Sequence, residues 1–372
     1  MMKDLPVKPP DKSSITDGGL VVHKKLRDRL NIGILTLGNF GNNMMRFLLR
    51  NRLPNVRYIA MDTDRQHLAQ IKAESFSEFF SEVIGENITH GRGTGGNIDR
   101  ANEIFESDKP NIAQYIEDLH FLFIIAGLGG GTGAIAPLIA ELAKTKNILT
   151  IMVLVYPFSM EGERKKEIAT KVLEASSRVA DGTIVFHNQT LIRHHGDMPI
   201  ERAFDQLNAQ IFDTIQALIN LIADSGTINV SLGDIENILC KKESDHEIAI
   251  LIGEGTGINR NEIATQRIIE QFEQHCKLNT IHKLLLYVQR GEDFKLIDLQ
   301  RIVDKLKHQM SAQDISIRIS TPYRDMEDTV RIIALLKGSK ADKLTEEPDI
   351  LSLPPEELES KIITGSINRK RR

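Results

Sequence analysis

One segment constrains the fold of this chain more than any other: residues 121–140 carry no charge, and glycines interrupt them. About 20 apolar residues are enough for a helix to span a membrane. Here, however, the middle reads Gly127-Leu-Gly-Gly-Gly-Thr-Gly133, with Pro137 soon after, and a run of glycines breaks a continuous helix. We therefore predict a buried strand over Phe121–Ala126, followed by a glycine loop and the start of a helix. This pattern favours a soluble protein.

Short apolar runs alternate with longer amphipathic segments through the first half of the chain. The runs at 121–126 and 148–156 are continuously apolar, as strands are when helices cover both faces of a parallel sheet. The expected strands are Ile32–Leu37, Val56–Met61, Phe121–Ala126, Ile148–Tyr156 and Gly182–Phe186. The helices expected between them include Asn42–Arg50 and Pro137–Lys144. This rhythm predicts an α/β fold with a doubly wound, mostly parallel sheet.

A long amphipathic helix is expected over residues 201–224, because apolar residues recur there at a spacing of three or four. A second series of elements follows. It comprises strand Glu247–Ile252, helix Asn261–His275, strand His282–Gln289, helix Lys295–Met310, and strands Ile315–Ser320 and Thr329–Leu336. We predict a flexible extension (1–28), a first domain (29–200), a central helix (201–224), a second, smaller α/β domain (225–338) and a disordered tail (339–372).

Composition narrows the classes of function. The chain has 47 Lys and Arg against 51 Asp and Glu, a net charge of −4, whereas domains that coat nucleic acid are usually strongly basic. Only two cysteines occur, Cys240 and Cys276, which excludes a disulfide framework and a multi-cysteine zinc site. We therefore expect no nucleic-acid partner and a cytoplasmic location.

Three glycine-rich segments fall where a strand meets a helix or a loop: residues 38–43, 91–97 and 127–133. Glycines let backbone N–H groups approach a phosphate, and ligands bind at the carboxyl ends of strands in open α/β sheets. Together the segments predict a nucleotide site. No P-loop motif is present.

A dinucleotide-binding pattern fits two of the glycine segments and remains an alternative. Gly91-x-Gly93-x-x-Gly96 matches the glycine spacing but follows no clear strand, and Gly129-x-Gly131-x-x-Ala134 matches in better context. The next strand, Ile148–Tyr156, lacks the acidic residue that would hold a ribose hydroxyl. A nicotinamide-dependent oxidoreductase is therefore the weaker interpretation.

The run Gly129-Gly-Gly-Thr-Gly133 after an apolar strand, with Pro157-Phe-Ser-Met-Glu-Gly162 further on, resembles the FtsZ branch of the tubulin superfamily. The resemblance extends from about residue 31 to residue 338. It implies a GTP-binding first domain that takes GTP, GDP and Mg²⁺, and head-to-tail polymerisation of the chain with itself. The family's tail motif is present only as the fragment Asp349-Ile350-Leu351, so a membrane-anchoring adaptor that binds the tail stays an open expectation.

Four loops hold the phosphates and the metal in this family, and the resemblance places them on this sequence. The first is Gly38-Asn39-Phe40-Gly41-Asn42, in which bulkier residues replace two family glycines. The second, Asp62-Thr63-Asp64-Arg65-Gln66, stands where the family has Asn-Thr-Asp-x-Gln, and it places Asp64 and Gln66 near magnesium. The third is Gly93-Thr94-Gly95-Gly96-Asn97. The signature loop comprises Gly129, Gly130, Gly131, Thr132 and Gly133, followed by Ala134-Ile135 where the family has Thr-Gly.

The remaining contacts implied by the resemblance concern the sugar and the base. Glu161 matches the ribose-binding glutamate, and Lys165 or Arg164 the basic residue near the phosphates. Asn188 matches the asparagine that holds the guanine edge. Phe204 and Asn208 lie one helical turn apart and match the residue that packs on the base and its second polar contact.

Hydrolysis in this family depends on a loop that enters the neighbouring subunit's pocket and reads Asn-x-Asp-x-x-Asp. Here Asn229 and Asp234 are retained, while Ser231 replaces the first aspartate. A serine hydroxyl is not ionised near neutral pH and does not act as a general base alone. The resemblance therefore implies a slow GTPase. A GTP-locked filament scaffold that does not turn over is the alternative.

Overall fold

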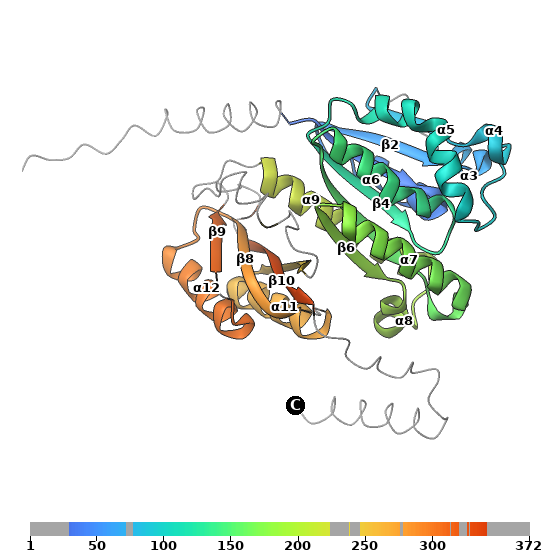
Figure 1. Ribbon diagram of the computed structural model, residues 1–372. Helices are drawn as coiled ribbons and strands as arrows, with labels where there is room; N and C mark the ends of the chain where they lie inside the picture. The colour runs from blue at the N-terminus through green and yellow to red at the C-terminus, as the bar shows by residue number, and fades with distance from the viewer. Residues whose placement is uncertain are drawn as a thin grey trace, which may run out of the picture.

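A six-stranded parallel sheet forms the first part of the molecule (Figure 1). The computed structural model describes residues 30–71, 77–223, 238, 246–275, 278–312, 314–319, 326 and 328–340. The strands lie in the order β3-β2-β1-β4-β5-β6, and every neighbouring pair is parallel. Their bounds are β1 Ile32–Leu37, β2 Val56–Asp62, β3 Phe79–Val83, β4 Phe121–Gly127, β5 Leu149–Tyr156 and β6 Gly182–His187. Strand order reverses between β1 and β4, where ligands bind in doubly wound sheets.

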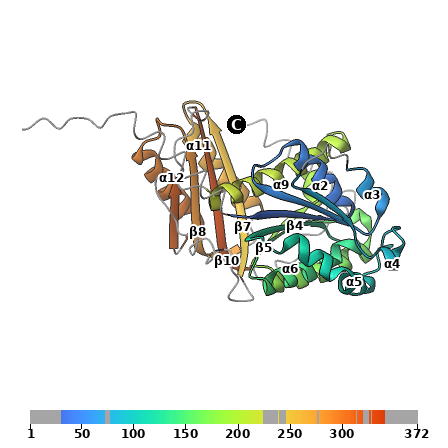
Figure 2. The same cartoon turned by 90° about the horizontal axis from the view of Figure 1, so that it is seen from above.

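Helices cover both faces of this sheet, as the continuously apolar strands require. Figure 2 shows α2, α3 and α9 on one face and α5 and α6 on the other. The long helices are α2 Gly38–Arg50, α5 Asp99–Ile116, α6 Ala136–Thr145, α7 Glu163–Val179 and α9 Ile200–Ala223. The shorter ones are α3 Arg65–Ala69, α4 Glu86–Thr89, α8 Gln189–His195 and the 3₁₀ turns η1 Thr132–Ile135 and η2 Ser159–Glu161. Because side chains alternate along a strand, Ile34 packs into the core beneath α2 and α9, and Leu35 into the core beneath α5, α6 and α7.

A second, mixed sheet of four strands follows, in the order β7-β10-β8-β9. The strands are β7 His246–Thr256, β8 Leu278–Arg290, β9 Asp314–Ile319 and β10 Thr329–Lys340. β10 is antiparallel to both β7 and β8, while β8 and β9 are parallel. Helices α11 Arg260–His275 and α12 Leu296–Met310 cover one face. The opposite face contributes Leu285, Tyr287 and Leu335 to the cluster that also contains the apolar stripe of α9.

The predicted fold class is confirmed, and the predicted strands differ from the observed ones only at their ends. One helix is corrected: α2 begins at Gly38 rather than at Asn42, because the first glycine segment forms its opening turn instead of a separate loop. Strand β3 and helices α3, α4, α5, α7 and α8 have no counterpart in the elements predicted above. Within the described part of the chain, no helix is long and apolar enough to cross a membrane.

Candidate functional site

The signature loop joins β4 to η1, and its glycines are in closely packed surroundings. A Cβ atom at Gly133 would lie less than 3.0 Å from the backbone oxygen of Gly127, and one at Gly131 equally close to the Thr94 side chain. Gly129 has a φ of +95°, a conformation that side-chain-bearing residues rarely adopt. Gly130 differs, because nothing lies within 4 Å of where its Cβ would be. Neighbouring atoms therefore pack closely against the loop at Gly129, Gly131 and Gly133, whereas the space beside Gly130 is open.

The third predicted loop lies against the signature loop. Thr94 is buried and contacts it, whereas Gly95 and Gly96, with φ values of +61° and +75°, face open space. The Asn97 side-chain oxygen accepts a hydrogen bond of 2.9 Å from the backbone N–H of Asp99, at the start of α5. Gly95 and Gly96 thus meet the requirement for close backbone approach to a ligand, while the Asn97 oxygen is engaged in capping.

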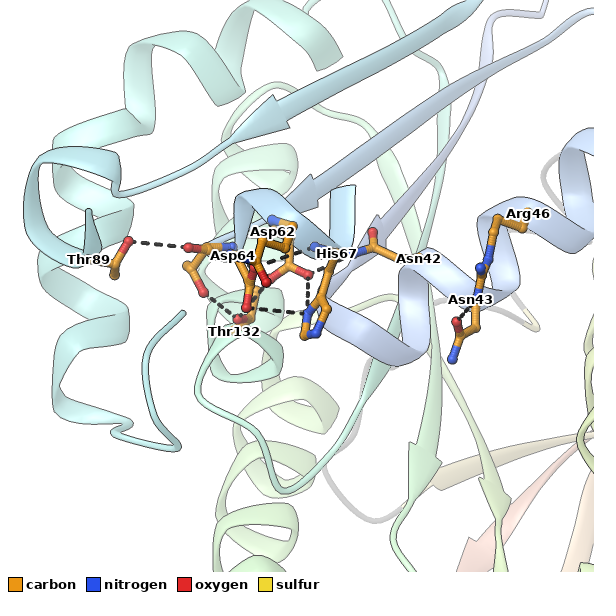
Figure 3. A network of polar contacts seen from close by, with 10 residues as sticks. Asn42, Asn43, Arg46, Asp62, Asp64, His67, Thr89 and Thr132 are labelled. Atoms are coloured by element: carbon orange, nitrogen blue, oxygen red, sulfur yellow. Dashed lines mark hydrogen bonds and ion pairs between the residues drawn. The ribbon is translucent and has the colours of Figure 1, made fainter. Parts of the chain in front are cut away.

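The first and second loops meet at a buried carboxylate, Asp62, the last residue of β2 (Figure 3). Its Oδ2 accepts a hydrogen bond of 2.6 Å from the amide of Asn42, the fifth residue of α2. Its Oδ1 accepts from the backbone N–H of Thr63 at 2.7 Å and from that of Asp64 at 3.2 Å. Burial raises the pKa of Asp62, and the backbone N–H groups of Asp64 and Thr63 and the nearby His67 oppose that shift.

The other residues predicted in these loops differ in exposure. Asn39 is exposed, and Gly41 is buried where a Cβ would lie 3.0 Å from the Thr36 backbone. Gly38 adopts a φ of +70° and faces Thr132. The tight packing of Gly38 and Gly41 explains why these two glycines of the first loop are present while Asn39 is tolerated between them.

The predicted magnesium ligands lie just beyond β2. Asp64 is half-buried and caps α3, its Oδ1 accepting from the backbone N–H of Gln66 at 2.8 Å, while the Gln66 side chain is exposed. No group of three or more His, Cys, Asp or Glu side chains suited to a metal ion is found in the part of the chain that the structure describes. Mg²⁺ is commonly held by one or two carboxylates together with phosphate oxygens and waters. The oxygen donors beside the glycine loops fit such a shared site.

The predicted ribose contact is placed at the end of β5. Glu161, in η2, accepts a hydrogen bond of 2.9 Å from the backbone N–H of Phe158 and pairs with Lys165 at 2.8 Å. Gly129 of the signature loop lies against Lys165, since a Cβ there would meet its backbone oxygen at 3.1 Å. Glu161 and Lys165, both predicted as ligand contacts, are therefore in contact with each other beside the signature loop.

The predicted base contacts converge at the end of β6. Asn188 is buried, and its side-chain oxygen has no hydrogen-bond partner among the described residues. The Phe204 ring packs edge-on against Phe158 with centroids 6.1 Å apart, and Asn208 is buried one turn further along α9. Leaving a buried polar atom unpaired costs about 1–3 kcal/mol. The Asn188 oxygen is thus a protein group that a ligand donor would satisfy.

The structure gives contacts to Asp62 that the sequence did not predict, and it shows the surroundings of Ile135. Asp62 has no predicted role within the second loop, although a charged residue directly after the uncharged run 58–61 was the available signal. Ile135 stands where the family has glycine. Its side chain is fully buried and packs in the core beneath α5, α6 and α7. The predicted hydrolysis residues Asn229, Ser231 and Asp234 lie outside the described residues.

A parallel sheet with glycine loops at its carboxyl edge, a long central helix and a second mixed sheet define a nucleotide-binding protein of the tubulin type. Residues 31–196 match the GTPase domain of the Tubulin/FtsZ family. These residues form a GTPase domain of the Tubulin/FtsZ type, and the comparisons support an FtsZ-like protein.

Individual relatives agree with this assignment. Cell division protein FtsZ 1 of Methanocaldococcus jannaschii is 28% identical over 309 residues, covering 82% of each chain. Cell division protein FtsZ of Buchnera aphidicola is 28% identical over 318 residues, covering 84% of this chain and 80% of the relative. A solved empty FtsZ dimer from M. jannaschii superposes with a TM-score of 0.72 at 26% identity, covering 90% of this chain and 99% of that one. CetZ2 from Haloferax volcanii, at 17% identity and a TM-score of 0.70 over 91% of this chain and all of its own, shares the fold.

Proposed function

We propose that this protein binds GTP, assembles head-to-tail into filaments and hydrolyses GTP slowly at the contact between subunits, in cell division or a related filament task. The observation that carries the nucleotide assignment is Asn188, whose buried amide oxygen lacks a partner among the described residues at the edge of the sheet where the glycine loops meet. Guanine offers N–H donors along the edge that an amide oxygen recognises, whereas adenine lacks the ring N–H. This supports GTP over ATP.

The residues around the site divide the nucleotide between them. Gly95, Gly96 and Gly130 leave open space for the phosphates beside backbone N–H groups. Asp64 and Gln66 would hold Mg²⁺, which neutralises phosphate charge when bound. The side chain of Glu161 is positioned toward Lys165, so a ribose hydroxyl and a phosphate would each find one partner in this pair.

Self-association rests on the relatives. The M. jannaschii FtsZ structure is a dimer, and the CetZ2 structure is a protofilament with GTPγS bound. In the proposed head-to-tail contact, the segment that follows α9 in sequence would reach the nucleotide of the next subunit. Asn229, Ser231 and Asp234 belong to that segment, and Asp234 is the carboxylate that would orient the attacking water. Adaptor binding through the tail stays a prediction from the sequence.

The experiment is a pelleting assay with GTP, GDP and a non-hydrolysable GTP analogue, combined with identification of the nucleotide that copurifies. We expect a guanine nucleotide and pelleting with GTP and the analogue but not with GDP. Pelleting to the same extent with GTP, GDP and the analogue would contradict the proposal. A copurified nicotinamide cofactor would favour the oxidoreductase alternative. Phosphate release then separates a slow GTPase from a GTP-locked scaffold, which assembles without releasing phosphate.

A further inference from the structure

Asp62 is the point at which three of the nucleotide loops are joined (Figure 3). Besides Asn42 from the first loop and the Thr63 and Asp64 backbone of the second, its Oδ1 accepts from the Thr132 hydroxyl of the signature loop at 3.4 Å. The Thr132 hydroxyl also lies 2.8 Å from that of Thr63. One carboxylate therefore contacts elements that follow β1, β2 and β4.

The environment of Asp62 shows why a carboxylate suits this place. The residue is 2% exposed, and a buried charge is costly unless hydrogen bonds satisfy it. Its neighbours present N–H and O–H donors, and a carboxylate offers two oxygens that only accept. Because the carboxylate cannot donate, the Asn42 amide turns its NH₂ group toward it. The Asn42 oxygen is then left buried without a partner among the described residues.

We propose that Asp62 is a positioning residue of the nucleotide site, which holds the first, second and signature loops in register with one another. The inference rests on the proposed GTP binding for its affinity measurement, but the loop register itself is a property of the protein without nucleotide. Asp62 acts through the loops and not through contact with the nucleotide.

The test compares Asp62→Ala with Asp62→Asn in the full-length chain. Alanine leaves the Thr63 and Asp64 N–H groups and the Asn42 amide without their acceptor, and we expect GTP affinity to fall about 10- to 100-fold. Asparagine keeps one oxygen for the two backbone N–H groups. Its new NH₂ group can donate to the Asn42 oxygen once that amide turns over, so we expect affinity close to that of the wild type. Equal losses in both variants, or no loss in Asp62→Ala, would overturn the proposal.

Hydrogen exchange of the nucleotide-free protein separates a positioning role from a local structural one. We expect Asp62→Ala to accelerate exchange at residues 38–42, 62–66 and 129–133 together, with the amides of β1 and β4 unchanged. Acceleration confined to residues 62–66 would mean that Asp62 stabilises only its own loop. Because this measurement needs no GTP, it decides the inference even if the wild type fails to bind GTP, which would instead refute the proposed function.

Two further variants complete the design. Asp118→Ala is the matched control, because Asp118 precedes β4 at the amino ends of the strands and binds Arg57. We expect unchanged GTP affinity and unchanged exchange in the three loops.

If Asp62→Ala fails to fold, Thr132→Val removes the signature-loop hydroxyl alone. We then expect faster exchange in the second and signature loops, and unchanged exchange there would contradict the proposal.

Discussion

Two glycines of the signature loop, three residues apart, are present for different reasons. Gly133 is required by the fold, because a Cβ there would collide with the Gly127 backbone, whereas Gly130 borders open space. We expect Gly133→Ala to lower the free energy of unfolding by about 1–3 kcal/mol, as overpacking does. Gly130→Ala should leave stability nearly unchanged but weaken GTP binding, because the added methyl group occupies space meant for phosphate.

Urea denaturation and GTP titration of the two variants check this. A Gly130→Ala protein that binds GTP as tightly as the wild type would show that the open space beside Gly130 is not part of the nucleotide site. A Gly133→Ala protein with wild-type stability would show that the loop can shift to accept a side chain.

Asn188 provides the test of base specificity. Removing its amide in Asn188→Ala takes away the partner expected for guanine, and we expect GTP affinity to fall by about 1–3 kcal/mol while the weak affinity for ATP barely changes. Titrations of both proteins with GTP and ATP measure this. Equal affinity of the wild type for the two nucleotides would contradict the assignment of guanine.

Residue roles were predictable where chemistry and spacing coincide, and not where a side chain has two possible partners. Glu161 and Lys165 were predicted as neighbours of the ligand and lie together. Asn97 was predicted in a phosphate loop, but its oxygen caps α5, because asparagine near a helix start competes for the free backbone N–H groups there. The contacts of Asp62 with Asn42 and Thr132 could not be predicted, because these residues lie 20 and 70 positions away in the sequence.

At the scale of single elements, the ion pair between Arg57 and Asp118 links β2 to the residues before β4, two strands that lie on either side of β1. The guanidinium donates to both carboxylate oxygens, at 2.5 and 2.9 Å, and these hydrogen bonds lower the pKa of Asp118 from 3.8. A lowered pKa means that the ionised form stabilises the fold. This stabilisation is present above the ordinary pKa of 3.8 and is lost as the pH falls below it through the lowered value.

Asp118→Asn should therefore lower stability near neutral pH, by less than about 1 kcal/mol because both side chains are partly exposed. The difference from the wild type should shrink at a pH well below 3.8. Urea denaturation at both pH values measures it. A difference that persists unchanged in acid would show that packing, and not charge, links the two residues.

Elements were predictable from sequence where apolar residues form continuous runs. β1 is predicted residue for residue, and β4 within one. Strand β3 was not predicted because it lies at the sheet edge and its residues are partly or fully exposed, so it lacks an apolar run. Helix α5 contains Pro110 in its interior, and a proline inside a helical pattern predicts that the helix ends there.

At the scale of the whole molecule, the proposed catalytic site is complete only where two subunits meet. Specific GTPase activity should then rise with protein concentration from near zero in dilute solution. Phosphate release measured across a dilution series checks this. A specific activity that stays constant down to the dilute limit would identify a self-contained enzyme.

Ser231 sets the expected rate of that shared site. A missing positioned carboxylate typically costs on the order of 10²–10⁴ in rate, so we expect slow turnover and long-lived filaments. Ser231→Asp should raise GTPase activity and shorten filament lifetime. Asp234→Ala should abolish turnover while GTP binding persists.

Glu236→Gln is the control for this pair, because Glu236 is the nearby carboxylate that could compensate for Ser231. A large loss of turnover in Glu236→Gln would assign the compensating role to it. Wild-type turnover as fast as that of Ser231→Asp would refute the account of the loop.

Helix α9 also determines which truncated forms of this protein can fold. Phe204, in its first turns, is the predicted packing partner of the base and contacts Phe158, while Leu218 and Ile222 share a core cluster with Tyr287 of the second sheet. At about 1.5 Å per residue, its 24 residues form a single rod shared by both halves. A fragment that stops after this helix would expose an apolar stripe to water, and one that starts after it would leave a sheet face bare. Truncated forms should therefore keep α9 together with both sheets, because this helix shares one core cluster with residues of both.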